Sequence, residues 1–233
     1  MTAVERYTAW INENIGFNPR AQQNSNALSQ FVIEDLCRVC PALDRDLDEE
    51  QVVVRLNAPV ATRVARRNVD LVFREVVAEG PLRQVRLAIE HKTIMTAHGK
   101  ARWNRYGDII AYANHLHNHW TKAIAASIVA INMNPNYLNP DPFARTIERS
   151  YTNMMKVVTD TINIFTNVPL RDLEDEPNDQ PEAVGIVVLD YDGANPARLV
   201  TGPPAPQAGE PGHYETFLRR LCELYCRRYG NTR

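Results

Sequence analysis

The chain has 233 residues, of which 44% are hydrophobic and 23% charged, and its formal net charge is −2. This composition excludes an intrinsically disordered chain, and the near-neutral charge argues against a protein that coats nucleic acid. The N-terminus lacks a signal-peptide pattern, and the longest apolar run, Ala123 to Ile131, is too short to span a bilayer. We therefore expect a cytoplasmic protein with no membrane partner.

The first predicted element is a helix over residues 24–39. Its apolar residues recur at helical spacing, with Asn24 or Ser25 as the N-cap and Pro41 just past the end. We expect this helix to cover one side of the domain core.

Three strands are predicted next. Residues 51–56 are β-branched and strand-like, and Asn57-Ala58-Pro59 interrupts them. Residues 69–77 and 85–92 contain apolar strand-like runs, and the turn at 79–82 between them is short. These two strands should therefore form an antiparallel hairpin.

A helix over about 100–119 and a continuously apolar strand over 123–133 follow the hairpin. This strand should run parallel to the strand before the helix, through a right-handed crossover. The remaining predicted elements are a helix over 144–165, a strand over 183–189 and a helix over 214–229. The pattern predicts one domain over 1–233 of the α/β (α+β) class, with the element order αβββαβ and a mixed sheet flanked by helices.

One pair of motifs stands out in the hairpin. Asp70 lies at the start of one strand, and Glu90-His91-Lys92 ends the other. Glu90 and Lys92 are two residues apart, so their side chains share a face, and Asp70 should lie beside them. Buried carboxylates are costly unless they are paired or bind a metal. We expect a hard divalent cation held by both carboxylates and the backbone carbonyl of His91; a salt-bridged Glu-Lys strand pair is the alternative.

This motif, in this order of elements, resembles the PD-(D/E)xK nuclease superfamily, which has the restriction-endonuclease-like fold. The resemblance covers about residues 24–133 and departs from the family pattern at Val69, where the family has proline. It implies that Asp70, Glu90 and Lys92 are catalytic and that Asp70 and Glu90 bind the metal. Glu34, in the first helix, matches the place of a further metal-facing carboxylate in many members.

The resemblance further implies a site-specific type II restriction endonuclease that cuts double-stranded DNA with Mg²⁺, or with Mn²⁺ as a substitute. Its expected partners are a second copy of the chain and, as a genetic neighbour, a cognate methyltransferase. Residues 134–233 would then serve dimerisation and DNA readout. A repair, junction-cleaving or modification-dependent nuclease is one alternative, and a DNA-binding protein without cleavage activity is another.

The charge distribution favours a polyanion near this motif. Residues 55–105 hold eleven basic and four acidic residues, a net charge of +7, which leaves −9 on the rest of the chain. A solvated charged face is the alternative interpretation. Hydroxyl, amide and basic groups near a helix N-terminus suit phosphate binding. The residues expected to contact DNA are Arg66, Arg67, Thr96, His98, Lys100, Arg102, Asn104 and Arg105.

Two further patterns allow a metal interpretation. The four cysteines form the pairs Cys37/Cys40 and Cys222/Cys226, which could join as a zinc site but at helical spacing favour core packing. His115, His117 and His119 lie at the end of a predicted helix without the glutamate of a zincin motif, which favours a solvated or capping cluster.

Overall fold

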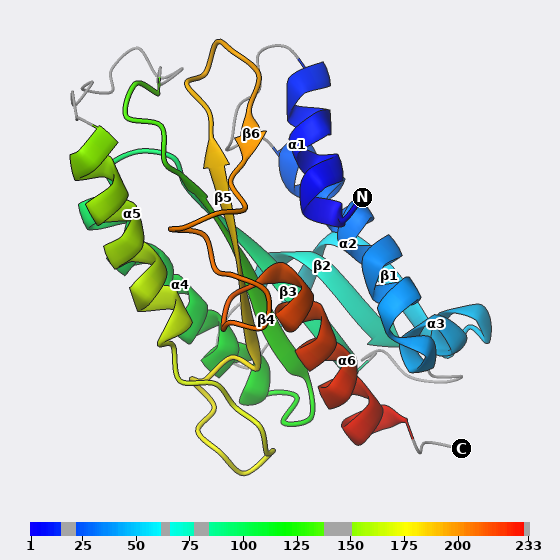
Figure 1. The fold of residues 1–233 in the computed structure, drawn as a ribbon. Helices are drawn as coiled ribbons and strands as arrows, with labels where there is room; N and C mark the ends of the chain where they lie inside the picture. The colour runs from blue at the N-terminus through cyan, green and yellow to red at the C-terminus, as the bar shows by residue number, and fades with distance from the viewer. Residues whose placement is uncertain (15–21, 62–65, 77–83, 138–150, 231–233) are drawn as a thin grey trace.

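The computed structural model describes residues 1–14, 22–61, 66–76, 84–137 and 151–230. Within these ranges the chain forms six helices and six strands (Figure 1). The helices are α1 (Ala3–Glu13), α2 (Gln22–Val39), α3 (Pro41–Asp48), α4 (His98–His117), α5 (Tyr151–Thr166) and α6 (Tyr214–Tyr229). The strands are β1 (Val52–Ala61), β2 (Arg66–Glu75), β3 (Val85–Ile94), β4 (Ile124–Asn132), β5 (Ala183–Asp190) and β6 (Arg198–Leu199).

The strands form one mixed sheet in sequence order, β1 to β6. β1, β2 and β3 are antiparallel neighbours, β3, β4 and β5 run parallel, and β6 pairs antiparallel with β5. The helix α4 connects β3 to β4, as expected for a crossover between parallel strands. All nine residues of β4 are buried, because helices cover both faces of the sheet at this strand.

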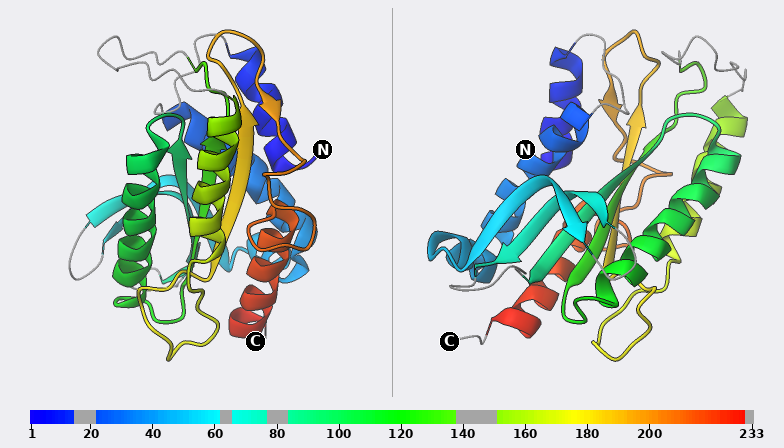
Figure 2. Two further views of the ribbon diagram at one scale, coloured as in Figure 1. Left: turned by 60° about the vertical axis from the view of Figure 1, so that its left-hand side comes forward. Right: turned by 180° about the vertical axis from the view of Figure 1, so that it is seen from behind.

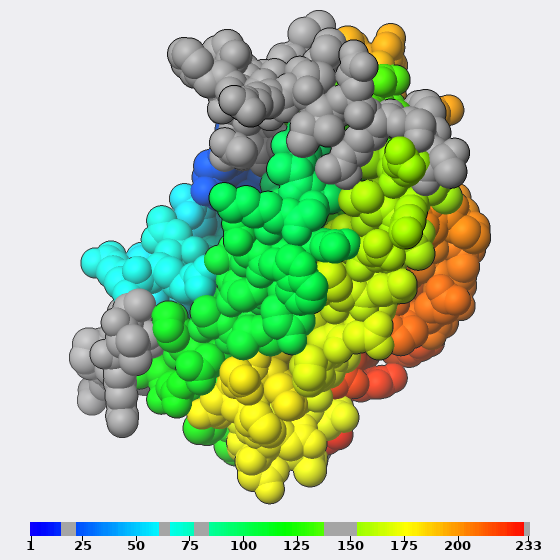
Figure 3. Space-filling view, turned by 90° about the vertical axis from the view of Figure 1, so that its left-hand side faces the viewer, coloured from blue at the N-terminus to red at the C-terminus, as the bar shows by residue number. Residues whose placement is uncertain are grey.

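The helices form two layers, one on each side of the sheet (Figures 1 and 2). α1, α2, α3 and α6 cover one face, and their apolar side chains join those of the strands in one large core cluster. α4 and α5 lie side by side on the other face, which Figure 3 shows in space-filling form. The α/β class with a mixed central sheet, predicted from the sequence, is confirmed.

Several predicted elements are confirmed in place. The strands predicted over 123–133 and 183–189 and the helix over 214–229 correspond to β4, β5 and α6. The antiparallel pairing of β2 with β3 and the parallel pairing of β3 with β4 are also as predicted. Two predictions, the turn at 79–82 and the first turns of the helix over 144–165, lie outside the described residues.

Other predictions were wrong in detail. Strand β1 is not interrupted at residues 57–59, because Ala58 and Pro59 pair in register with β2. The local departure from strand geometry is at Asn57, which has a φ of 44°. Pro59 is tolerated because β1 is an edge strand. Asn24 and Ser25 are not N-caps, since α2 already includes Gln22.

Three elements were not predicted: α1, α3 and β6. The first two are amphipathic helices that pack against the same face of the sheet as α2. Among the described residues, we find no helix with the length and apolar character needed to cross a membrane.

Candidate active site

The β2–β3 register determines where the motif residues lie. Leu71 pairs with Ile89, so the next residues outward on the two antiparallel strands are Asp70 and Glu90. Lys92 lies two residues further along β3, on the same face of the strand as Glu90. The register therefore places Asp70 opposite Glu90 in the second half of β3, which continues to Ile94. Asp70 and Lys92 line one pocket, whereas Glu90 is not among the residues that line it.

Asp70 is held by hydrogen bonds to both carboxylate oxygens. The backbone N–H of His91 donates to Oδ2 at 2.7 Å, and the hydroxyl of Ser25, on α2, donates to Oδ1. The hydroxyl of Ser29, one turn further along α2, lies 3.4 Å from the backbone carbonyl of Asp70. Helix α2 thus fixes the orientation of this carboxylate.

Glu90 is buried between two cations. Its Oε1 atom lies 2.8 Å from Nζ of Lys92 and also pairs with the guanidinium of Arg67. Burial raises the pKa of Glu90 above its ordinary value, although Lys92 and Arg67 act to lower it. The second oxygen, Oε2, is buried and has no hydrogen-bond partner among the described residues. This oxygen remains able to accept one further ligand.

A pocket of about 220 Å³ opens beside these residues. Its wall includes Ser25, Asp70, His91, Lys92, Thr93 and Arg105. Arg105 is fixed by an ion pair to Asp108 at 2.9 Å and a weak hydrogen bond to the carbonyl of Thr93. The pocket joins one carboxylate to two cationic side chains, which suits a phosphate group together with a metal ion.

The His91 backbone carbonyl faces the same region. Within a strand, the N–H and C=O of one residue point to the same side. The N–H of His91 donates to Asp70, on the β2 side, so its carbonyl also faces that side. The predicted third oxygen ligand thus faces the side of β3 on which β2 and Asp70 lie.

Ser25, His91 and Asp70 do not form a nucleophilic triad. In such a triad the histidine lies between the hydroxyl and the carboxylate. Here Ser25 occupies the middle position: its Oγ donates to Asp70 and lies 3.2 Å from Nδ1 of His91. The contacts orient Asp70 and do not activate the serine as a nucleophile.

Glu34 does not join this site, so the predicted extra metal ligand is corrected. It lies nine residues after Ser25 on α2, about 13 Å along the helix axis. Its carboxylate is half exposed and pairs with Arg6 at 3.2 Å. The side chains that α2 directs towards Asp70 are Ser25 and Ser29.

The predicted DNA-contact residues fall into two groups. Lys100, Asn104 and Arg66 are exposed, and Thr96, Arg102 and Arg105 are partly exposed. His98 is buried, with Nε2 2.7 Å from the carbonyl of Asn132, and Arg67 pairs with Glu90. In this structure His98 connects the start of α4 to the end of β4, and the exposed contact expected of it is corrected.

The positive field is smaller than the sequence count indicates. Arg86, counted in the basic stretch, is buried and pairs with Asp46 at 2.7 Å and Glu75 at 2.6 Å. Among the described basic residues of this stretch, the exposed ones are Arg55 on β1, Arg66 on β2 and Lys100 on α4. Trp103, an exposed aromatic side chain that was not predicted to contact DNA, follows Lys100 on α4.

Of the histidine cluster, His117 has a structural role. It is fully buried, and its Nε2 lies 3.0 Å from Oε2 of Glu182. His119 stacks edge-on against Trp120. The predicted solvated or capping cluster was therefore wrong for His117, which is buried against Glu182.

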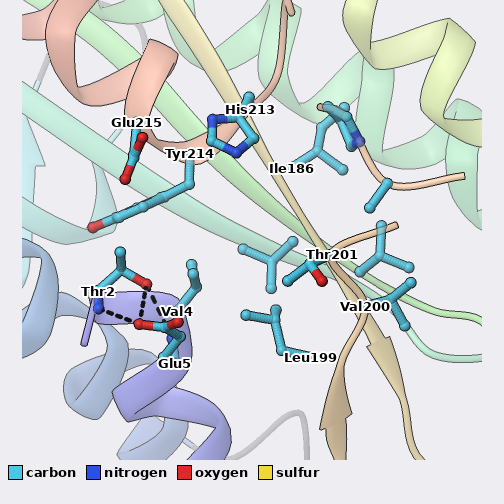
Figure 4. A pocket seen from close by; sticks show the side chains of 14 residues that line it. Thr2, Val4, Glu5, Ile186, Leu199, Val200, Thr201, His213, Tyr214 and Glu215 are labelled. Carbon is cyan, nitrogen blue, oxygen red and sulfur yellow. Dashed lines mark hydrogen bonds between the residues drawn. The ribbon is translucent and has the colours of Figure 1, made fainter. Parts of the chain in front are cut away.

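A second pocket, of about 180 Å³, lies where α1 meets β5, β6 and the start of α6 (Figure 4). Ile186, Leu199 and Val200 form an apolar part of its wall. The Glu5 carboxylate accepts hydrogen bonds from the N–H and hydroxyl of Thr2, at 2.6 and 3.2 Å, in the capping box of α1. Since this carboxylate serves the helix, we assign no catalytic role to the pocket.

His91 should make stability depend on pH. Burial lowers the pKa of His91, so the folded state keeps the ring neutral where an unfolded histidine, with an ordinary pKa of about 6.5, takes up a proton. The unfolded state then binds more protons, and the free energy of unfolding falls as the pH drops below about 6.5. We expect the free energy of unfolding, measured with urea at several pH values between about 5 and 7, to change less with pH for His91→Gln than for the parent. Equal slopes would contradict this assignment.

We compared the chain with protein-family models, curated proteins and solved structures, and none of them matches.

Proposed function

We propose that the protein is a Mg²⁺-dependent endonuclease that hydrolyses phosphodiester bonds in double-stranded DNA, as a site-specific type II restriction enzyme acting as a homodimer. The order α2-β1-β2-β3-α4-β4 supports a restriction-endonuclease-like core, with α3 as an additional helix between α2 and β1. Asp70 in the second strand and Glu90-x-Lys92 in the third correspond to the PD-(D/E)xK motif.

One observation carries the proposal. Asp70 and Glu90 occupy adjacent register positions, with Lys92 on the same face, and Oε2 of Glu90 is buried without a partner among the described residues. A buried carboxylate oxygen without a partner costs free energy, and a bound cation would satisfy it.

The residues present fit a magnesium ion. Mg²⁺ prefers hard oxygen ligands and one or two carboxylates, which Asp70, Glu90 and the His91 carbonyl supply. When bound, the ion would supply Lewis-acid stabilisation of the scissile phosphate and would favour ionisation of water. Magnesium binds the ionised carboxylate and therefore competes with protons. Because burial raises the pKa of Glu90, we expect the affinity for magnesium to rise with pH.

The side chains around the ligands have separate roles. Ser25 and the His91 N–H hold Asp70 in one orientation. Lys92, which lines the pocket and bonds Glu90, would orient the attacking water and offset the negative charge that develops on the phosphate. Arg105 would position the DNA phosphate, since its guanidinium lines the same pocket.

The start of α4 supports DNA as the substrate. Lys100 and Asn104 are exposed there, and the side chain of Trp103 is 57% exposed. An indole placed among cationic side chains can contact sugars or unstacked bases while the cations bind phosphates. The α4 N-terminus follows β3 directly, so these groups lie near Lys92.

Incubation of the purified protein with unmethylated plasmid or phage DNA and Mg²⁺ tests the proposal. We expect discrete fragments, and no fragments when EDTA replaces Mg²⁺. A smear, or cleavage of branched or modified DNA alone, would instead favour the related nucleases. Binding to DNA without cleavage in either Mg²⁺ or Mn²⁺ would favour the non-catalytic alternative, for which the pairing of Glu90 with Arg67 and Lys92 is the supporting observation.

Lys100→Ala and Arg66→Ala should each weaken DNA binding, because both side chains are exposed cations beside the site. We expect each variant to lose affinity a few-fold. The slope of the logarithm of the association constant against the logarithm of the salt concentration should also be shallower by about one. Fluorescence anisotropy with Ca²⁺ in place of Mg²⁺ would measure binding without cleavage. Arg219→Ala, which removes an exposed cation from α6 on the other face of the sheet, is the matched control and should bind as the parent does.

A further inference from the structure

Three cysteines from distant parts of the chain meet beside α6. Cys40 is the N-cap residue of α3, and Cys222 and Cys226 lie one turn apart on α6. Their three sulfur atoms all lie within 4.8 Å of one another, and those of Cys222 and Cys226 are 3.9 Å apart. Cys37, which the sequence pairs with Cys40, is outside this cluster.

We propose that Cys40, Cys222 and Cys226 bind one zinc ion, with the fourth coordination position open to solvent. The site is separate from the proposed magnesium site and does not depend on the proposed nuclease function.

The sulfur spacing fits zinc coordination. Zinc–thiolate bonds of about 2.3 Å in a tetrahedron place the sulfur atoms about 3.8 Å apart. The Cys222–Cys226 separation of 3.9 Å already meets this requirement, and the 4.8 Å limit on the others leaves at most a small side-chain adjustment for Cys40. The spacing of four residues on α6 directs two thiols to one face, and Cys40 supplies the third from across the interface.

Core packing accounts for only part of the cluster. Cys40 is fully buried, but Cys226 is exposed and gains little from hydrophobic burial. Its exposure also gives the fourth coordination position access to water, as in sites with three protein ligands.

The location gives the ion a role in the fold. It would join the α2–α3 corner to α6 across 182 positions of sequence. The same interface has other polar contacts: the hydroxyls of Tyr214 and Tyr225, on α6, donate to Asp35 and Asp46 at 3.0 and 2.8 Å. Because the folded state alone assembles the three thiols, zinc should stabilise it.

Metal titration of the reduced, metal-free full-length protein tests the site. We expect one equivalent of Zn²⁺ by equilibrium dialysis and metal analysis, and one equivalent of Co²⁺ with a thiolate-to-cobalt charge-transfer band. Free Zn²⁺ at about 100 times the dissociation constant should raise Tm by about 5–10 °C. Absence of both the thiolate band and stoichiometric zinc binding would overturn the proposal.

Three serine variants locate the ligands. Cys226→Ser, at an exposed position that should not disturb folding, and Cys40→Ser should each lower zinc affinity at least 10-fold and weaken the cobalt band. Cys37→Ser is the matched control, because it removes a neighbouring thiol outside the cluster, and should bind as the parent does. Unchanged binding in Cys226→Ser, or an equal loss in Cys37→Ser, would overturn the assignment.

Discussion

Replacing Lys92 with alanine should reduce the rate of DNA cleavage by about 10²–10³-fold while leaving DNA binding nearly unchanged. Lys92 lines the pocket with Asp70 and pairs with Glu90, so its ammonium group is placed to stabilise negative charge that develops only during the reaction. An interaction made mainly in the transition state contributes to the rate and little to binding. Single-turnover cleavage and anisotropy, measured on the same DNA, separate the two effects.

Asp70→Asn and Glu90→Gln should lower cleavage by a similar or larger factor, because each removes a charged metal ligand and keeps the side-chain shape. Both variants should remain folded. Glu90→Gln keeps the side-chain shape but removes the counter-charge of Lys92 and Arg67, so its stability must be measured beside its activity. Circular dichroism and thermal unfolding would check that lost cleavage does not reflect unfolding.

Glu34→Gln is the matched control for these carboxylate variants. The family resemblance places a metal ligand at Glu34, whereas the structure pairs this side chain with Arg6 at the α1–α2 contact. We therefore expect Glu34→Gln to cleave at the parental rate. Loss of cleavage in this variant, or full cleavage by Lys92→Ala, would contradict the site described above.

The parts of the fold predicted correctly are those with a strong local signal. The apolar runs within β2, β3 and β4 correspond to buried stretches of these strands. Helix α3 was missed because Pro41 was interpreted only as the end of the helix before it. Proline also favours the first position of a helix, and here it begins α3.

The site was only partly accessible from the sequence. Asp70, Glu90 and Lys92 follow from strand periodicity and a short motif, which need no knowledge of tertiary packing. Ser25 could not be predicted as the partner of Asp70, because its role depends on how α2 lies across the sheet. The same dependence explains the error at Glu34. The place of a residue in a helix does not predict its contacts until it is known which face of the helix packs against the sheet. The sequence likewise could not show which basic side chains are exposed, since Arg86 and Arg67 form ion pairs with acidic residues of the same chain.

A buried cluster around Glu182 should dominate the stability of the fold. Glu182 is fully buried just before β5, and its carboxylate accepts hydrogen bonds from Arg228 at 2.8 Å and the N–H of Ala125 at 2.7 Å. His117 and the fully buried Arg171 lie 3.0 and 3.6 Å from the same carboxylate. The cluster thereby joins α4, α6 and the starts of β4 and β5. Burial lowers the pKa of Arg171, and the Glu182 carboxylate acts to raise it.

Glu182→Ala should therefore lower the free energy of unfolding by about 3–5 kcal/mol, because it leaves buried cations without a counter-charge. Urea unfolding would measure the change, and Tm should fall by roughly 10 °C. Glu223→Ala is the control: it breaks an exposed ion pair with Arg219 on α6 and should cost less than about 1 kcal/mol. Equal losses in the two variants would contradict a dominant role for Glu182.

The same variant separates stability from catalysis. Glu182 and Ala125 lie at the amino-terminal ends of the parallel strands β5 and β4, whereas Glu90 and Lys92 lie towards the carboxyl-terminal end of β3. Ala125 pairs in register with Ala88, so the cluster lies towards the amino-terminal side of Glu90 and Lys92 along the parallel strands, and α/β proteins generally bind ligands at the carboxyl ends of their strands. At a temperature where Glu182→Ala remains folded, its cleavage rate should equal that of the parent. A large loss of cleavage in the folded variant would mean that the cluster also positions the catalytic residues.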